Sequence, residues 1–395
     1  MAKTKLMTSG KKIEFVIENR LYDVTKFGKI HPGGDLILEN FNDCDVTDYF
    51  YALHSEKARK MLKNMPSTEV PDKDKLPESW YLKLMYQLEK GHLFKANYFI
   101  EALQIAHTIG FLFLATWWGN TYPLLAAVCL GFGTLLGGWI GHQSDHQRNN
   151  IMRAVNLVYV PICDGLSPAW WSDKHNRHHL STNEVDYDGD IQLFPFIYLW
   201  TPKKEQDRWN RGLQHIYFSA LYSILQIKWQ FDSLMYAINH RIYKELIGLV
   251  IHWIWYLCFL PWKVWVLGVL IAGTISAWVV TASHQAEVKL DGKRDFAPGE
   301  VVKSKYQIHD YFAHQIVTTR NIFINSWFIN YISGGMQYQI EHHIFPRIPL
   351  YKLPEVKPLI EKICAERGLE YMEESFWEIT KRNFSNIAEF AKVKV

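Results

Sequence analysis

The sequence predicts an α-helical integral membrane protein with four transmembrane helices in two hairpins, a histidine-rich polar cap and a small soluble module at the N-terminus. Residues 102–144 contain no Asp, Glu, Lys or Arg, and residues 246–286 contain only Lys263. The aromatic content of 15%, with 16 tryptophans, is also high for a soluble protein. Uncharged runs this long seldom occur outside bilayers. We therefore prefer membrane spans to buried helices of a large soluble domain.

The 395-residue chain is long enough for more than one domain. We expect the soluble module over residues 1–66, a linker over residues 67–79 and the membrane domain over residues 80–395. The run STEVPDKDKLPE, rich in proline and charge, indicates the linker. The first residues are polar and basic without an apolar stretch, so no signal peptide is visible and we expect a cytosolic N-terminus.

The net charge and the cysteines exclude several kinds of partner and site. A formal charge of +3 gives no reason to expect a nucleic acid partner. The five cysteines are scattered and include no CxxC pair, so neither a disulfide framework nor a zinc knuckle is indicated.

Each uncharged block is long enough to cross a bilayer twice. A helix rises about 1.5 Å per residue and needs about 20 apolar residues to span the hydrocarbon core. The run GNTYP at residues 119–123 divides the first block, and Pro261 divides the second. We expect spans at about residues 98–118, 122–141, 245–261 and 264–282.

Both hairpin turns are short, so the larger polar regions lie on one side of the membrane. These regions carry most of the lysines and arginines, and the excess of basic residues predicts that this side, with both termini, is cytosolic. His107 and His252 fall inside the expected spans, where an ionisable residue is a functional candidate. We interpret each of them as a neutral imidazole that is hydrogen-bonded between helices.

The N-terminal module contains a pair of histidines suited to haem. His31 is followed by Pro32, Gly33 and Gly34, which permit a tight turn that aims an imidazole inward. His54 follows in a half-apolar helical stretch. A haem iron bound by two histidines has no open site, so it shuttles electrons rather than binding oxygen.

This module resembles cytochrome b5 over about residues 12–66, and residues 31–34 match the HPGG signature of that family. The resemblance implies a small α+β domain that binds haem b, with His31 and His54 as the axial ligands. The region before Val16 is shorter than in typical members of the family.

Three clusters of histidines follow in the membrane part. Residues one helical turn apart share a face, so each cluster can direct several imidazoles at one metal. The clusters have the patterns HxxxH, HxxHH and QxxHH: His142 and His146; His175, His178 and His179; and Gln339, His342 and His343. Seven clustered imidazoles exceed what one metal uses, so two metals are indicated. We prefer iron to zinc because a haem module is fused to the chain and zinc has no redox chemistry. A hydrolytic zinc site is the weaker interpretation.

Residues 80–375 resemble the membrane-bound fatty acid desaturases of the front-end type. The resemblance rests on AWW before KHNRHH at residues 169–179 and on QIEHHIFP at residues 339–346. The glutamine that opens the third cluster, where other desaturases have histidine, marks the front-end type together with the fused cytochrome. The first cluster departs from the commoner form, because Asp145 stands where a glycine usually precedes the second histidine.

The resemblance implies a di-iron site. Its ligands would be the seven clustered histidines and His284, which lies just beyond the fourth expected span. Gln339 is implied as a catalytic residue that either coordinates weakly or hydrogen-bonds near the iron. Ligand imidazoles need acceptors that fix their tautomers, and nearby candidates are Asp145, Asp173, Asp186, Asp188 and Asp190.

The implied reaction is oxygen-dependent desaturation of a fatty acyl lipid or acyl-CoA. The resemblance implies a new cis double bond between an existing double bond and the carboxyl end of a polyunsaturated chain. Electrons would pass from NADH through cytochrome b5 reductase to the haem and then to the iron pair. We expect a multi-pass protein of the endoplasmic reticulum membrane.

Three other functions remain open. A sphingolipid long-chain-base desaturase has the same fused architecture, and a di-iron lipid hydroxylase uses the same kind of site. The third is a membrane-anchored electron-transfer protein whose histidine clusters are vestigial. The complete sets of ligands argue against this last alternative, because a haem carrier needs only the first 66 residues and one anchor.

Overall fold

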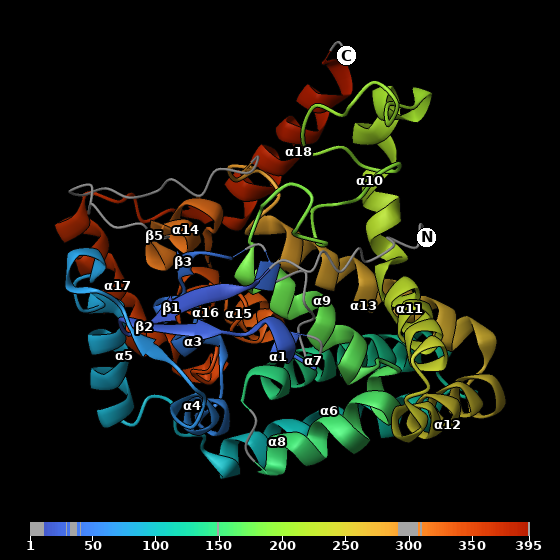
Figure 1. Cartoon of the computed structure of the whole chain (residues 1–395). Helices are drawn as coiled ribbons and strands as arrows, with labels where there is room; N and C mark the ends of the chain where they lie inside the picture. Colours follow the sequence, from blue (N-terminus) through green and yellow to red (C-terminus); the bar gives the residue numbers. More distant parts are fainter. Residues whose placement is uncertain are drawn as a thin grey trace. The chain divides into compact units, whose positions relative to one another are not determined.

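The computed structural model describes residues 12–28, 30–31, 38–39, 41–147, 150–290, 307–308 and 310–393 (Figure 1). The chain divides into two compact units, one of residues 1–87 and 294–314 and one of residues 88–293 and 315–395. The first is a small α+β unit and the second is almost wholly helical. This composition agrees with the predicted fold class, while the expected domain boundaries at residues 66 and 79 stay a prediction.

A small mixed sheet organises the first unit, with the strand order β4-β2-β1-β3-β5. The strands β1 (Glu14–Ile17) and β2 (Arg20–Asp23) form an antiparallel hairpin. Glu18 and Asn19 in its two-residue turn both have positive φ, as a tight hairpin favours. The other strands are β3 (Cys44–Asp45), parallel to β1; β5 (Gln307–Ile308), parallel to β3; and β4 (Thr68–Glu69), antiparallel to β2.

Short helices complete this unit: α1 (Thr25–Gly28), α3 (Thr47–Leu53), α4 (Glu56–Lys63), η1 (Asp72–Asp74) and the start of α5 (Trp80–Lys90). Val16 and Val70 are buried under the sheet beside Leu21. The side chain of Ser55 accepts a hydrogen bond from the backbone N–H of Ala58 and so begins α4 directly after His54. His54 lies between α3 and α4, so these two helices fix its position.

The second unit is built around one long helical hairpin. The helices α6 (Tyr98–Trp118) and α7 (Pro123–His146) lie side by side and are joined by the predicted turn (Figure 1). Helix α13 (Trp262–Ala282) packs along α7 as well. Glycines allow this approach: a Cβ at Gly133 would come within 2.6 Å of Leu112 in α6, and one at Gly131 within 2.7 Å of Ile271 in α13. Helix α7 is therefore packed from both sides.

Within the described part of the chain, three helices are long and apolar enough to cross a membrane: α6, α7 and α13. Helix α12 (Tyr243–Phe259), in the region of the third expected span, has 17 residues and carries Lys244 and Glu245 in its first turn. Trp117 and Trp262, at the ends of the two hairpins, are 72% and 65% exposed, as interfacial tryptophans would be. The structure thus supports a membrane protein with at least three candidate spans.

The rest of the second unit forms a polar cap. Its helices are α8 (Asn150–Ala154), the π-helix η2 (Val155–Asp164), α9 (Pro168–Leu180), η3 (Trp209–Leu213), α10 (Gln214–Ser223), α11 (Leu225–Asn239), the second half of α14 (Tyr311–Thr318), α15 (Trp327–Ser333), α16 (Gln339–Ile344), η4 (Leu350–Lys352), α17 (Leu353–Arg367) and α18 (Phe376–Lys392). The strands β6 (Asn321–Phe323) and β7 (Glu373–Ser375) pair in parallel. Helix α18 runs beside α10 (Figure 1).

The two histidines in the expected spans are hydrogen-bonded, as predicted. His252 is fully buried in α12; its Nδ1 lies 2.9 Å from the carbonyl oxygen of Ile162 and its Nε2 lies 3.2 Å from the amide of Gln230. The Nε2 atom of His107 lies 3.2 Å from the hydroxyl of Tyr331. Both histidines therefore connect elements that are distant in the sequence.

Candidate metal centre

The end of α7 carries the first pair of predicted ligands. His142 and His146 lie four residues apart on one helical face, with ring centroids 5.1 Å apart. His142 is 3% exposed. A Cβ at Gly137, further back on α7, would overlap with Asp164 and Tyr159 of η2. This close packing fixes the helix at the end from which the two imidazoles project.

Helix α9 carries the second cluster, and its N-terminus is firmly capped. The hydroxyl of Ser167 accepts a hydrogen bond from the backbone N–H of Trp170 at 3.1 Å. The same hydroxyl donates to the carboxylate of Glu245 at 2.5 Å, and that carboxylate also lies 3.3 Å from the backbone N–H of Ala169. A negative charge is favourable at the N-terminus of a helix. The three ligands in the following turns are all buried: His175, His178 and His179.

The third cluster lies on α16, which has only six residues. Such a short helix is unstable alone, so tertiary contacts hold it. The carboxylate of Glu341 accepts hydrogen bonds from Asn321 and Tyr371, each at 2.7 Å. The side-chain oxygen of Asn321 also accepts from the backbone N–H of Ile340 at 2.9 Å. These bonds position the rest of the cluster: Gln339, His342 and His343, all at most 2% exposed.

The eight predicted metal-binding histidines converge into two groups in the second unit. Within each group, one nitrogen from every ring lies within 4.8 Å of the others. The five-histidine group contains His142, His146, His175, His179 and His342, and the three-histidine group contains His178, His284 and His343. Each cluster in the sequence contributes to the centre, and His284 joins it from the end of α13.

The rings of the five-histidine group point their Nε2 atoms at one another. The Nε2 of His175 lies 3.0 Å from that of His146 and 3.1 Å from that of His179, which is itself 3.1 Å from that of His342. Among the described residues, neither ring nitrogen of His142 has a hydrogen-bond partner, although both are buried. Buried polar atoms without partners are rare because they cost free energy. A metal ion among these rings would satisfy them.

Burial favours the neutral form of His175, His179 and His284. Desolvation, followed by the neighbouring imidazoles, holds the pKa of His175 and of His179 well below its ordinary value. Desolvation and then His178 lower the pKa of His284 to about 3. A histidine binds metal through the lone pair of its neutral form. The environment therefore suits metal binding without prior loss of protons near neutral pH.

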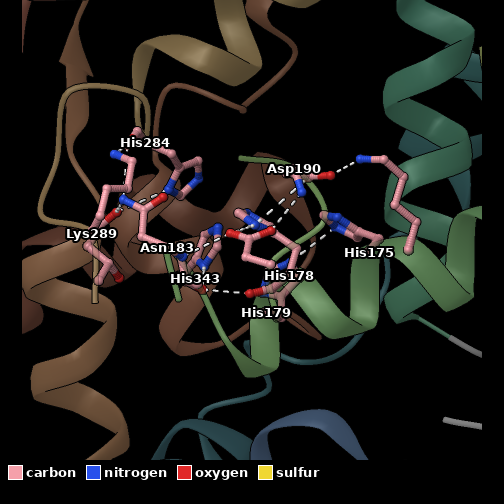
Figure 2. A network of polar contacts seen from close by, with 12 residues as sticks. His175, His178, His179, Asn183, Asp190, His284, Lys289 and His343 are labelled. Carbon is pink, nitrogen blue, oxygen red and sulfur yellow. Dashed lines mark hydrogen bonds and ion pairs between the residues drawn. The ribbon is translucent and has the colours of Figure 1, made fainter. Parts of the chain in front are cut away.

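His178, His284 and His343 of the three-histidine group lie within one network of polar contacts (Figure 2). Each Nδ1 in this group lies close to an acceptor. The Nδ1 of His178 lies 2.9 Å from a carboxylate oxygen of Asp188, and that of His284 lies 3.2 Å from the carbonyl oxygen of Thr318. The Nδ1 of His343 lies 3.0 Å from the side-chain oxygen of Gln315. A hydrogen bond donated from Nδ1 leaves the lone pair on Nε2 for a metal.

Asp188 is the acidic residue that contacts a predicted ligand most closely. Burial raises the pKa of this carboxylate, but the charge and hydrogen bond of His178 and the backbone N–H of Asn183 outweigh burial, so that the pKa is lowered. Two backbone N–H groups, of Asn183 and Asp190, donate to it at 2.8 Å each. Asp188 therefore stays ionised and held in place beside His178.

The other acidic candidates stand further from the ligands or have other partners. Asp173 forms an ion pair with Arg177 on α9, and Asp190 forms one with Lys174. The nearest oxygen of Asp190 lies 3.8 Å from Nδ1 of His178. Of the five candidates named from the sequence, Asp188 thus has the clearest role.

The sequence did not reveal two partners of the three-histidine group. Gln315 acts through its side-chain oxygen and Thr318 through its backbone carbonyl. A backbone carbonyl has no sequence signature. Gln315 lies in the middle of α14 and begins the stretch QIVTTRN. Only the folded chain brings it next to His343.

A second pair of histidines lies in the first unit. The rings of His31 and His54 have centroids 6.0 Å apart and an interplanar angle of 44°. Two imidazoles that bind one ion from opposite sides have ring centres about 6 Å apart, since each metal–nitrogen bond is about 2 Å. The Nδ1 of His54 lies 3.1 Å from the carbonyl oxygen of Phe50, which fixes the tautomer with Nε2 as the ligand atom. This spacing fits a haem iron; Pro32, Gly33 and Gly34 lie outside the described residues.

Comparisons with known proteins agree with both sites. Residues 115–375 match the fatty acid desaturase family, and residues 2–69 match the cytochrome b5-like heme/steroid binding domain. The Delta(5) fatty acid desaturase fat-4 of Caenorhabditis elegans is 32% identical, over 91% of this chain and 92% of the relative. The Delta(8)-fatty-acid desaturase of Euglena gracilis is 30% identical, over 89% of this chain and 88% of the relative. The Delta(6)-fatty-acid desaturase fat-3 of C. elegans is 28% identical, over 95% of this chain and 96% of the relative. The chain therefore belongs to the fatty acid desaturase family, as an oxidoreductase with an N-terminal cytochrome b5-like domain.

Proposed function

We propose that this protein is an oxygen-dependent front-end desaturase. It introduces a cis double bond into a polyunsaturated fatty acyl chain, between an existing double bond and the carboxyl end. The observation that carries the proposal is the convergence of eight buried histidines into two groups, in the unit that contains the long apolar helices. The names of the relatives, which are delta-5, delta-6 and delta-8 desaturases, support the front-end type.

Each histidine group would hold one iron ion, since imidazole suits iron and the donor set contains nitrogen only. When bound, the iron pair supplies the redox chemistry with O₂ that removal of two unactivated hydrogens requires. The chain orients the ligands through Asp188, Thr318 and Gln315. Gln339 lies one turn before His342 and His343 on the same face of α16, and we assign it a catalytic role beside the iron.

His31 and His54 would be the axial ligands of haem b in the cytochrome b5-like unit. Two histidine ligands leave no open position, so this site transfers electrons. The electrons would come from NADH through cytochrome b5 reductase and pass on to the iron pair. A chain with its own haem donor needs only the reductase as an external protein partner.

We also propose four spans, with α12 as the fourth beside α6, α7 and α13. Its 17 residues extend about 25 Å, at the short end of the range for a transmembrane helix. Four spans place the N- and C-termini on one side, which the distribution of basic residues makes cytosolic. The endoplasmic reticulum membrane is the expected location, because cytochrome b5 electron transfer operates there.

The test is lipid profiling of yeast that expresses the full chain and is fed polyunsaturated fatty acids, with double-bond positions located by mass spectrometry. We expect a new double bond on the carboxyl side of an existing one. His178→Ala should abolish it, because this residue is a ligand in the three-histidine group. His240→Ala is the matched control, since His240 is exposed and contacts only the backbone of Tyr236 among the hydrogen bonds of its described side chain.

Two other kinds of product would contradict the proposal and identify a different function. Unsaturated long-chain bases with unchanged fatty acids would identify a sphingolipid desaturase. Hydroxylated acyl chains would identify a hydroxylase that uses the same metal centre.

A further inference from the structure

A cavity of about 110 Å³ lies in the second unit between α6, α7 and α15. Its walls include apolar side chains of α7 and a set of polar side chains from three elements. The lining residues include Gln104, His107, Trp139, Gln143 and Tyr331. None of the eight metal-binding histidines lines it. The cavity is therefore separate from the metal centre.

Hydrogen bonds hold three of the polar side chains in place: His107, Tyr331 and Gln143. The hydroxyl of Tyr331 lies 3.2 Å from Nε2 of His107. The side-chain oxygen of Gln143 accepts from the backbone N–H of Leu350 at 3.1 Å, and its NH₂ group lies 3.4 Å from the carboxylate of Glu101. These bonds fix polar groups in the wall before any ligand arrives, which favours recognition of one defined group.

The chemistry of the wall suits a neutral hydrogen-bond acceptor. The described residues that line the cavity include no Asp, Glu, Lys or Arg. A carboxylate or a phosphate would therefore meet no compensating charge, which makes its burial costly. The side-chain NH₂ group of Gln104 and the hydroxyl of Tyr331 are donors for a carbonyl oxygen.

Exposed residues of α6 and α15 flank the cavity. His107 is exposed on α6, and Leu103, one turn earlier on the same face, is 59% exposed. Phe328, one turn before Tyr331 on α15, is 43% exposed. Exposed apolar residues on both flanks indicate contact with lipid rather than water. A ligand can thus enter from the side, directly out of the bilayer.

The inner end of the cavity lies next to the metal centre. Gln143 directly follows His142 on α7, and Trp139 precedes it by one helical turn. One turn of helix rises about 5.4 Å. The cavity wall therefore includes the part of α7 that directly precedes and follows His142 of the five-histidine group. In a front-end reaction, the reacting methylenes lie a few carbons from the acyl carbonyl.

We propose that this cavity binds the acyl carbonyl of an ester-linked membrane lipid and so sets the position of the new double bond. The carbonyl accepts hydrogen bonds from Tyr331 and Gln104, and the acyl chain continues past Trp139 toward the two histidine groups. The inference rests on the proposed desaturase function. It adds the class of substrate and a site that fixes the distance from the acyl carbonyl to the carbons that react.

The experiment uses the purified full chain, loaded with haem and iron, in phosphatidylcholine vesicles with NADH and cytochrome b5 reductase. Tyr331→Phe and Gln104→Leu each remove one donor, and Tyr243→Phe is the matched control because Tyr243 is 69% exposed on α12. We expect kcat/KM to fall about fivefold for each donor variant, the effect of one neutral hydrogen bond. We also expect a mixture of adjacent double-bond positions. The control should match the wild type in rate and position.

A second measurement does not depend on turnover. A phosphatidylcholine with a photoreactive diazirine beside the ester carbonyl is cross-linked to the protein, and the labelled peptides are mapped by mass spectrometry. We expect label on residues 104–108 of α6 and on α15, reduced in Tyr331→Phe. Label elsewhere, or variants with one unchanged double-bond position, would overturn the inference.

A parallel reaction with acyl-CoA separates the two sources of an acyl carbonyl. Faster desaturation of acyl-CoA than of the phospholipid, with acyl transfer blocked, would reject the lipid ester. No product from the wild type with either substrate would count against the desaturase function, while the cross-linking result would still decide whether the cavity binds the lipid carbonyl.

Discussion

The imidazole of His178 and the carboxylate of Asp188 are 2.9 Å apart, with side chains 5% and 0% exposed. Such a pair fixes the ring orientation of a metal ligand and raises its basicity. His178 belongs to the three-histidine group, which has fewer protein ligands than its neighbour. The metal position there depends more strongly on each ligand's orientation.

Asp188→Asn should therefore reduce iron affinity or activity about 10- to 100-fold. Asparagine can present its amide NH₂ to Nδ1 and then favours the wrong tautomer of His178. Iron content by mass spectrometry and turnover in the same preparation measure the effect. Asp173→Asn, which breaks only the ion pair with Arg177 on α9, should keep both values close to those of the wild type. Equal losses in the two variants would contradict the assigned role of Asp188.

His54→Ala should abolish the haem absorbance and leave the iron content unchanged. The ring of His54 faces that of His31 in the first unit, while the eight histidines proposed to bind iron lie in the second. Absorption spectra and metal analysis of one sample distinguish the two cofactors. His240→Ala should retain both. Loss of iron in His54→Ala would show that the two sites are not independent.

Ser167→Ala should destabilise the second unit by about 1 kcal/mol, the usual cost of a lost N-cap. It should also weaken iron binding, because α9 carries three ligands and loses the link from Ser167 to Glu245. Ser375→Ala is the matched control, since Ser375 caps α18 with a capping box and no iron ligand lies on that helix. Thermal unfolding should show similar losses in both variants, with reduced iron content in Ser167→Ala alone.

Arg320→Met should lower the free energy of unfolding by about 3–5 kcal/mol, because it leaves a buried carboxylate without its partner. The Nε of Arg320 lies 2.7 Å from Glu287, and the two side chains are 8% and 5% exposed. Denaturant titration in detergent measures the change. The double variant Arg320→Met with Glu287→Met should recover much of the loss, since no charge then stays buried at position 287.

Cys364 should resist alkylation at neutral pH. Burial, followed by the nearby carboxylate of Glu341, raises the pKa of its thiol to about 12. The thiolate is the reactive form, so the labelling rate should rise about tenfold for each pH unit below that value. Cys258 is exposed at the end of α12, next to the hairpin turn, and is the internal comparison in detergent solution. Mass spectrometry of maleimide-treated protein should find Cys258 labelled first, and Cys364 labelled readily only after unfolding.

Sequence patterns predicted which histidines gather in the fold, because each cluster is local. His142 and His146 share a face of a helix whatever surrounds it, and the same holds for His178 and His179 with His175. Patterns could not divide the eight histidines into groups of five and three. His178 and His179 are adjacent in the chain yet belong to different groups, because neighbouring residues on a helix point about 100° apart.

The membrane spans were predicted from the length of the runs without charged residues. Such runs indicate that a long apolar helix is present, but they do not locate its first and last residues. The first hairpin turns where GNTYP predicted it, and α7 begins at Pro123. Helix α7 nevertheless runs to His146, beyond the expected end near residue 141, because its last turn is buried among cap residues and no longer needs to be apolar. The π-helix η2 was not expected, since no residue pattern marks it.

Gly133 and Gly131 allow Leu112 of α6 and Ile271 of α13 to pack directly against α7. This close packing limits which substitutions the enzyme can tolerate on α7. Any side chain larger than hydrogen at Gly131 or Gly133 would push α7 away from α13 or from α6, and the end of α7 carries two of the proposed iron ligands. Adaptation to longer, shorter or differently unsaturated lipids, in nature or in the laboratory, therefore has little freedom on that helix. Substitutions that change the substrate should therefore occur mainly on α6 and α15. Mutant libraries that aim at new lipid products are best made at residues of these two helices.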